Sequence, residues 1–323
     1  MKSQSRITKV LNIEKPIIQG PMTWLTDARL VAAVSNAGGL GVLGPNAGQT
    51  TPATSVEEAV EKMRIEIQKT KKLTTKPFGL SLLPGEAEKD PFTVPMIKMA
   101  AEEKVAAVTY VGNVIRPELF EMLRQNNIKI IYRALCPNLK VAKEAEKYGA
   151  DIIAVTGFDH GGDLPKKTIS NFDLIPMTVD AVDIPIVADG GIADARGVKA
   201  AFALGAEGIY SGTVFITSDE CRANNEVKKM IVKNDAEDLL LFRTAPAPYY
   251  RSLPTKLANH LVQMDKEGVP STEIGQAMRG GIKAAMFDGD FDHGYISVGN
   301  GISNIHAIRP VSAIINDLMQ GIE

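Results

Sequence analysis

The chain has 323 residues, of which 45% are hydrophobic and 23% are charged, so it can bury a large core without disulfide bonds. The 36 Lys and Arg residues nearly balance the 38 Asp and Glu residues, and the net charge of -2 argues against nucleic acid or an anionic membrane as the main partner. No apolar run approaches the about 20 residues of a membrane span, and the polar segment 1–9 lacks the apolar stretch of a signal peptide. The two cysteines, Cys136 and Cys221, cannot form a disulfide framework, so a reducing cytosol is the expected location.

Short apolar runs follow one another along the chain, and most of them are continuously apolar rather than alternating. This pattern is typical of strands that are buried on both faces of a parallel sheet. The eight runs occupy residues 16–22, 40–45, 77–83, 106–112, 129–135, 151–157, 185–191 and 208–215.

Helical patterns separate these runs. The clearest is 55–72, where Ser55 and Glu58 have the spacing of a capping box and apolar residues recur on one face. Three predicted helices end next to a glycine (Gly38, Gly149 or Gly205), the residue type that most readily adopts the left-handed conformation that ends a helix. The other predicted helices are 27–37, 95–104, 117–125, 138–148, 173–182 and 194–204.

Eight strands that alternate with helices predict a (β/α)8 TIM barrel, and the structural alternative is an open doubly wound sheet. After the eighth strand, 219–266 is polar and helical in pattern, with an interruption at 245–249 that contains two prolines. We interpret this part as a smaller helical insertion over the barrel mouth. The predicted domains are therefore a barrel from 1–217 plus 286–323 and a helical lid or substrate domain at 218–285.

Glycines follow the seventh and eighth predicted strands, where barrels of this kind often bind phosphate. Gly190 and Gly191 follow the seventh strand, and Gly212 and Thr213 follow the eighth. Glycine lets a backbone approach a ligand closely, and the exposed N–H groups together with the Thr213 hydroxyl can donate to a phosphate. Either pair alone is better explained as a tight turn. The two pairs together predict a ligand that carries a phosphate.

The loop after the sixth strand, 157–163, contains two acids, one imidazole and three glycines. His160 is a candidate for proton transfer because the unperturbed pKa of histidine lies near neutrality, and a solvated loop histidine is the alternative. The four histidines lie far apart, and none pairs with cysteine at the spacing of a zinc site, so no metal site is predicted. Cys136 follows the fifth strand, where a small core residue is the expected role.

Five segments in order resemble the flavin mononucleotide (FMN) barrel enzymes that include nitronate monooxygenases, also called 2-nitropropane dioxygenase-like enzymes, and enoyl-ACP reductase II. Their order and spacing agree over nearly the whole chain, and the polar insertion resembles the small substrate domain of that family. The resemblance implies that the barrel binds FMN. The segments are 16–22, 33–41, 76–81, 188–192 and 204–213.

The resemblance also implies the cofactor-binding residues. The glycines after strands seven and eight would hold the phosphate with Thr213, and the end of strand one would lie against the ring. Ser81 occupies a position where relatives often have Asn, and Asp159 replaces a Glu that meets the ribityl chain. Gly299 and Asn300 correspond to a Gly-Gln pair near the flavin edge. The complete predicted set is Gly20, Pro21, Met22, Ser81, Asp159, Gly162, Gly190, Gly191, Ser211, Gly212, Thr213, Gly299 and Asn300.

The chain departs from the family pattern at the proposed catalytic base. Relatives read Gly-x-Glu-x-Gly-Gly-His after strand six, whereas Asp163 stands at the position of that histidine and His160 lies three residues earlier. The reference pKa of an aspartate lies about 2.6 units below that of histidine, so Asp163 is a weaker base unless burial raises its pKa. We therefore treat both His160 and Asp163 as candidate catalytic residues.

The resemblance implies an FMN-dependent oxidoreductase that oxidises alkyl nitronates or related small carbanionic substrates with O2. The main alternative is an NAD(P)H-dependent reductase of an enoyl thioester or a quinone, because hydride transfer needs no side-chain base and tolerates Asp163 better. A flavin-free barrel enzyme for a phosphorylated substrate would need a cysteine after strand six, which this loop lacks. A flavoprotein that has lost catalysis is the remaining alternative. The expected partners are a small-molecule substrate and, as an open choice, a second copy of the chain in a homodimer.

Overall fold

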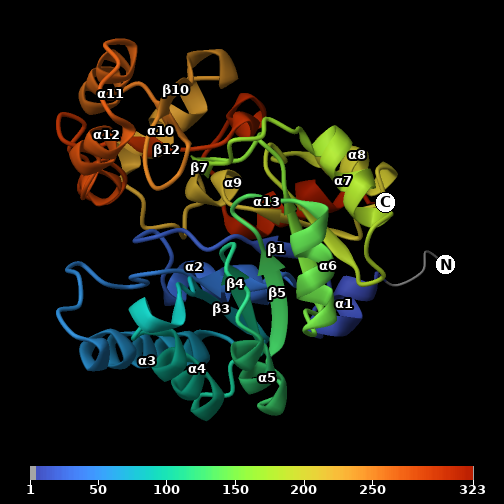
Figure 1. Cartoon of the computed structure of the whole chain (residues 1–323). Helices are drawn as coiled ribbons and strands as arrows, with labels where there is room; N and C mark the ends of the chain where they lie inside the picture. The colour runs from blue at the N-terminus through green and yellow to red at the C-terminus, as the bar shows by residue number, and fades with distance from the viewer. Residues whose placement is uncertain (1–4, 323) are drawn as a thin grey trace.

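The computed structural model describes residues 5–322, and within them eight parallel strands form a barrel surrounded by helices (Figure 1). All eight predicted runs are strands of this barrel, and their spatial order is β1-β9-β8-β6-β5-β4-β3-β2. Residues 1–4 and 323, which the predicted barrel domain includes, lie outside the described part. The barrel strands are β1 (Ile17–Gln19), β2 (Gly41–Leu43), β3 (Phe78–Leu82), β4 (Ala107–Val111), β5 (Lys129–Arg133), β6 (Ile152–Thr156), β8 (Ile186–Asp189) and β9 (Gly208–Ser211).

The barrel closes between β1 and β2, which pair through a parallel bridge between Ile18 and Leu40. Gln19 reinforces this contact: its backbone N–H donates to the carbonyl of Leu40 at 2.9 Å, and its side-chain Oε1 accepts from the backbone N–H of Val42 at 3.0 Å. Because Gln19 is fully buried, its side chain satisfies backbone groups that such short strands leave unpaired. The closed order excludes the open doubly wound sheet.

The predicted helices form, and their ends follow the local sequence. The side chains of Asp27 and Asn138 accept hydrogen bonds from the first turns of their helices. Ser55 accepts from the N–H of Glu58, but the carboxylate of Glu58 binds Thr54 instead, so only half of the predicted capping box forms. The helices around the barrel are α2 (Ala28–Asn36), α3 (Val56–Leu73), α4 (Thr93–Glu102), α5 (Pro117–Gln125), α6 (Leu139–Lys147), α7 (Asn171–Val179), α8 (Ala195–Ala203), α9 (Thr213–Ile216) and α13 (Val311–Met319).

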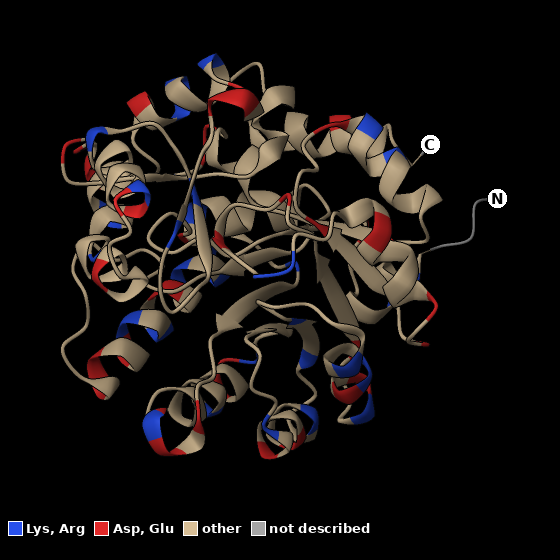
Figure 2. Ribbon diagram, turned by 45° about the horizontal axis from the view of Figure 1, so that its top comes forward, with Lys and Arg blue, Asp and Glu red and all other residues tan. Residues whose placement is uncertain are grey.

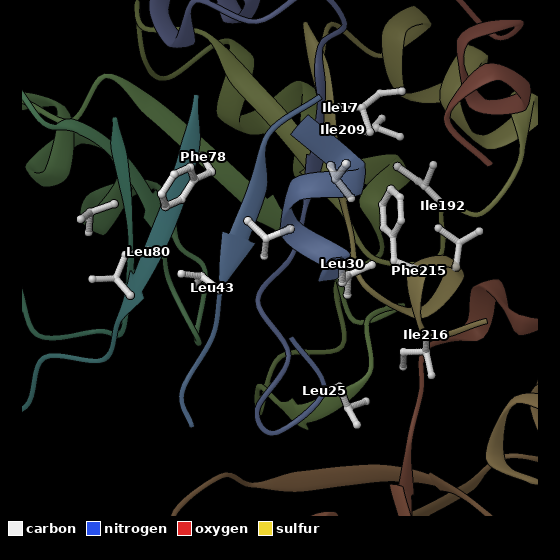
Figure 3. Packing of buried hydrophobic residues seen from close by; sticks show 14 of the residues in the cluster. Ile17, Leu25, Leu30, Leu43, Phe78, Leu80, Ile192, Ile209, Phe215 and Ile216 are labelled. Carbon is white, nitrogen blue, oxygen red and sulfur yellow. The ribbon is translucent and has the colours of Figure 1, made fainter. Parts of the chain in front are cut away.

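Apolar side chains pack in two layers, one inside the barrel and one between the strands and the helices. The inner layer contains the first residues of β4 and β6, and α1 (Arg6–Leu11) packs Ile7 and Leu11 against it. This helix therefore closes the barrel at the amino ends of the strands, opposite the end where ligands bind. Figure 3 shows part of the outer layer, including Leu30 of α2 and Leu80 of β3.

The insertion after β9 is not all helical, so that part of the prediction is wrong. It contains the antiparallel hairpin β10 (Leu240–Arg243) and β11 (Tyr249–Leu253) between α10 (Asn225–Lys233) and α11 (Lys256–Lys266), followed by α12 (Ser271–Ala277). The helices and the hairpin gather at the upper left of Figure 1, in orange. A hairpin is typically formed by two short aromatic or apolar runs with a turn between them, and here the turn contains proline. From the sequence alone, we interpret this proline segment only as an interruption of a helix. Shorter elements are η2 (Ala236–Asp238), η3 (Lys283–Asp288), β12 (Ile296–Ser297) and η4 (Asn300–Asn304).

The hairpin joins the insertion to the barrel through a shared sheet. The loop after β6 contains a short strand, β7 (Gly162–Leu164), which pairs antiparallel with β11, and Asp163 lies opposite Tyr250 in the register. Arg251 donates from Nη1 to the backbone carbonyls of Phe158, at 2.8 Å, and His160. The insertion thus fixes the loop that carries both catalytic candidates.

Gly41 is a position where the fold requires glycine for space. A Cβ there would lie 2.7 Å from Cα of Val31 in α2, where neither backbone can move freely. We expect Gly41→Ala to lower the free energy of unfolding by about 1–3 kcal/mol through overpacking, measured by urea denaturation. Gly85→Ala is the control, because its nearest neighbour would be Cβ of Asp90 at 3.7 Å, and it should change stability by less than about 0.5 kcal/mol. Equal losses in both variants would contradict this explanation.

Charged residues of both signs are interspersed along the outer helices (Figure 2). Many form ion pairs between neighbouring elements, such as Arg64 of α3 with Glu102 of α4 at 2.6 Å. No helix in the described range is long and apolar enough to cross a membrane.

Candidate functional site

A cavity of about 560 Å³ opens at the carboxyl ends of the barrel strands and extends to the insertion. It is where parallel-stranded barrels place their active sites. Most of the residues predicted from sequence meet there, although they come from β1, β3, the loops after β6, β8 and β9, and the segment after β12. The predicted residues that line the cavity are Gly20, Pro21, Met22, Ser81, His160, Gly162, Asp163, Gly190, Gly191, Ser211, Gly212, Thr213 and Gly299.

Asp159 and Asn300 lie behind the cavity wall. The Asp159 carboxylate accepts the backbone N–H of Asn171, the first residue of α7, at 3.1 Å. Its carbonyl accepts the backbone N–H of Asn300 at 3.0 Å. In this geometry, both residues hold the loops after β6 and β12 together.

The glycine loops approach one another so closely that they form a cradle of backbone. Gly190 and Gly191 have φ angles of +100° and +72°, and a Cβ on Gly190 would lie 2.9 Å from the backbone nitrogen of His160. A Cβ on Gly299 would lie 2.8 Å from the carbonyl oxygen of Asp159. Thr213 Oγ1 accepts the N–H of Gly299 at 3.1 Å, so its hydroxyl hydrogen stays available to a ligand. A phosphate fits such a cradle of N–H groups.

The Ser211 hydroxyl has a structural partner. It donates to the carbonyl of Ile192 at 2.8 Å and so connects the ends of β9 and β8. Ser211 therefore shapes the cradle and has no hydroxyl hydrogen left to donate to a ligand.

Two buried polar atoms of the cavity lining, Ser81 Oγ and His160 Nε2, have no hydrogen-bond partner among the described residues. The buried hydroxyl of Tyr210 also lines the cavity and interacts with that of Thr109, on the strand next to Ser81. Buried polar atoms are nearly always satisfied, so such a group indicates a missing polar ligand. A flavin ring carries both hydrogen-bond donors and acceptors on one edge, and the residues present therefore fit the ring and the phosphate of a flavin nucleotide.

Sequence reasoning missed a buried ion pair in the cavity wall. Arg133, at the end of β5, donates from Nε to the carboxylate of Asp189, at the end of β8, at 2.7 Å. Thr156 donates to the same carboxylate at 3.1 Å. Both charged side chains line the cavity and are largely buried. Arg133 could have been found from the sequence, because it is a charged residue at the carboxyl end of a mostly apolar strand.

His160 is a buried, neutral imidazole and not a solvated loop residue. Its Nδ1 lies 2.8 Å from the carbonyl of Gly161, so Nδ1 carries the hydrogen and Nε2 presents a lone pair. Burial, with the positive charge of Arg133, lowers the pKa of His160 to about 3. His160 can accept a hydrogen bond in the cavity but does not carry a charge at neutral pH.

The neutrality of His160 can be tested by NMR. Because its pKa is lowered to about 3, we expect the ring signals of His160 to stay unchanged between pH 5 and pH 8. The signals can be assigned by their loss in His160→Gln. A titration midpoint near the ordinary value of about 6.5 would contradict the described burial.

Asp163 reaches the interior of the cavity from β7. Its side chain is exposed to the cavity space, yet the surrounding walls reduce its hydration and raise the pKa of its carboxyl group, while Arg133 opposes this rise. A raised pKa makes the carboxylate a stronger base, which brings Asp163 closer to the histidine found in relatives. No cluster of three or more His, Cys, Asp or Glu side chains in 5–322 is arranged to hold a metal ion.

The insertion contributes a cationic mouth to the cavity. Its charged lining residues are Arg279 and Lys283. Lys283 pairs with Asp288 at 2.6 Å and lies over the ring of Trp24, at 5.9 Å from its centre. Arg279 is exposed and has no ion pair within the described residues. An anionic group that enters the cavity is therefore attracted at its mouth.

Comparisons with known proteins agree with this site. The family model described as nitronate monooxygenase matches residues 4–321. A Rhodococcus jostii protein named (3aS,4S,5R,7aS)-5-hydroxy-7a-methyl-1-oxo-octahydro-1H-indene-4-carboxyl-CoA dehydrogenase is 33% identical over 80% of this chain and 68% of its own length. A Staphylococcus aureus protein named probable nitronate monooxygenase is 26% identical over 99% of both chains.

Solved structures include a similar protein, FabK from Thermotoga maritima. It is 31% identical, with a TM-score of 0.87 over 99% of this chain and 96% of its own. Proteins of this family are typically flavin enzymes. The extent of the family match, together with the cavity at the carboxyl ends of the barrel strands, shows that this chain is an oxidoreductase of the nitronate monooxygenase family.

Proposed function

We propose that this protein is an FMN-dependent oxidoreductase that oxidises alkyl nitronates or related small carbanionic substrates, with O2 as the final acceptor. The observation that carries the proposal is that Asp163, a carboxyl group with a raised pKa, lies in the same cavity as the glycine cradle. The relatives named as probable nitronate monooxygenases support this reading.

The residues have separate roles in this proposal. The glycine cradle and the Thr213 hydroxyl hold the phosphate of FMN, and Gly20, Pro21 and Met22 lie against its ring. When bound, FMN supplies the two-electron redox chemistry. Where the substrate arrives as the neutral nitroalkane, the Asp163 carboxylate would accept the proton from the carbon next to the nitro group, whereas a nitronate has already lost that proton and needs no such step. Arg279 and Lys283 attract the substrate as an anion, and the insertion keeps bulk water away from the reacting carbon.

A second candidate function is the NAD(P)H-dependent reduction of an enoyl thioester. The cationic mouth favours it, because Arg279 and Lys283 suit the phosphate groups of a coenzyme A or carrier-bound thioester. The Rhodococcus jostii relative is named for a carboxyl-CoA substrate, and FabK is an enoyl-ACP reductase II. For this reaction Asp163 would act in its protonated form and donate the proton. We also propose a cytoplasmic location, which fits the two free cysteines.

An absorption spectrum of the purified protein tests the proposal. Flavin bands that bleach anaerobically with an alkyl nitronate and return with O2 are expected. Bleaching by NADH or NADPH, but not by the nitronate, would establish the reductase instead. A colourless protein that cannot be reconstituted with FMN would disprove both.

A further inference from the structure

Two tyrosines line the same cavity as Asp163, and they lie far from it in the sequence. Tyr250 lies opposite Asp163 in the β7–β11 ladder, so their side chains project from the same face of the sheet. Tyr295 contacts Tyr250 edge to face, with ring centres 4.9 Å apart. All three side chains line the cavity.

The tyrosine hydroxyls form a short polar chain in an apolar wall. Tyr250 and Tyr295 are almost fully buried, and the hydroxyl of Tyr250 interacts with those of Tyr295 and Ser297. A hydroxyl group donates only one hydrogen bond, so two phenols in series use one O–H on each other and leave the second for a ligand. Hydrogen bonds in such a chain strengthen one another.

Charged groups on the neighbouring elements restrict what can bind here. The charge of Asp163 interacts with that of Arg133 of β5 and with the two phenols, and the neutral His160 precedes Asp163 in the same loop. Burial raises the pKa of both tyrosines, and the negative charge of Asp163 adds to the rise, so both phenols stay protonated. An anion next to an ionised Asp163 would be repelled, whereas an anion next to a protonated Asp163 would receive hydrogen bonds.

We propose that Asp163, Tyr250 and Tyr295 form an oxyanion site for a planar conjugated acid, such as a nitroalkane or a thioester with an acidic C–H. The Asp163 carboxylate takes the proton from the substrate carbon and becomes neutral. The electron pair of the broken C–H bond moves onto the substrate oxygen, and the phenol chain donates a hydrogen bond to that oxygen. The same steps in reverse deliver a proton to carbon.

This inference rests on the proposed function only in its use of Asp163 as the proton acceptor, and it can be tested without turnover. The probe is 4-cyanophenol, which carries an acidic O–H on a planar conjugated ring and has a distinct ultraviolet band as the phenolate. Binding to the purified holoprotein is measured by difference absorption and calorimetry at a pH below the phenol's own pKa. We expect the phenolate band to appear on binding, since the phenol transfers its proton to Asp163.

Three variants separate the roles. In Asp163→Asn the phenolate band should disappear, because no group remains to accept the proton. In Tyr295→Phe the dissociation constant should rise about tenfold or more, as expected for a lost hydrogen bond to a charged oxygen. In Tyr250→Phe it should rise by less, because the hydroxyl that is lost only supports the one that binds the ligand. Tyr148→Phe, a tyrosine outside the cavity, is the control and should bind as the unaltered protein does.

Binding without ionisation, no binding, or equal affinity in the Tyr295→Phe, Tyr250→Phe and control variants would overturn the oxyanion site. A cooperative thermal unfolding transition establishes that each variant is folded. The phenol-binding assay needs no nitronate, O2 or NAD(P)H, so it can be interpreted even if the proposed reaction does not occur. In the same way, a lack of phenol binding does not affect the flavin absorption assay.

Discussion

Arg133→Met is expected to lower the free energy of unfolding by about 3–5 kcal/mol at pH 7. The substitution keeps much of the side-chain volume but leaves Asp189 as an uncompensated charge in the wall of the cavity, where its side chain is only 8% exposed. Removing one member of a buried pair costs far more than the pair contributes, because the remaining charge has lost its hydration. Urea denaturation measures the loss.

Lys129→Met, on the same strand, is the matched control. Lys129 pairs with Asp151 at 2.9 Å, and its side chain is 46% exposed, so its loss should cost less than about 1 kcal/mol. Similar losses in the two variants would contradict the role of the pair.

Asp163→Asn is expected to lower kcat by about 10²–10⁴, the usual contribution of a general acid or base. The amide keeps the size of the side chain but cannot exchange a proton with the substrate. Because the pKa of Asp163 is raised, turnover that needs the carboxylate should rise with pH through a midpoint above the ordinary value of about 3.9. Steady-state kinetics across pH 4–9 provide both measurements.

The same substitution should stabilise the protein at neutral pH. A group whose folded-state pKa is raised stabilises the fold below its unfolded pKa and loses that contribution as the pH rises through the folded value. The ionised Asp163 therefore costs stability at pH 7, and Asp163→Asn removes this cost. We expect a higher urea midpoint than that of the unaltered protein at pH 7, with the difference vanishing towards pH 3. A variant that loses both turnover and stability would show a structural role instead.

The barrel was predictable because its signals are local. Each strand is a continuously buried apolar run, and the glycines that end the helices have positive φ angles, such as +97° at Gly149 and +103° at Gly205. The insertion was less predictable, because the β10–β11 hairpin depends on tertiary pairing with β7 and β12 more than on its own sequence.

The part of the candidate site that is formed by the backbone could be predicted from the sequence. The part that depends on contacts between side chains from distant segments could not. The glycine cradle follows from residue types at strand ends. The pairing of Tyr250 with Asp163 depends on strand register, and Arg133 and Asp189 approach only because β5 and β8 lie on either side of β6. The neutrality of His160 depends on burial and on a backbone carbonyl, neither of which the sequence reveals.

The pairing of β7 with β11 limits how this enzyme can be rebuilt. A covering domain that is joined only by flexible linkers could be exchanged between relatives as a separate module. Here one strand of the insertion's sheet belongs to a barrel loop, and Arg251 binds the backbone of that loop. A chimera that receives only 218–285 from a relative would pair β7 of this chain with β11 of the relative, two strands that did not evolve together. Transfer of substrate preference therefore requires that the loop after β6 move with the insertion, as one inherited unit.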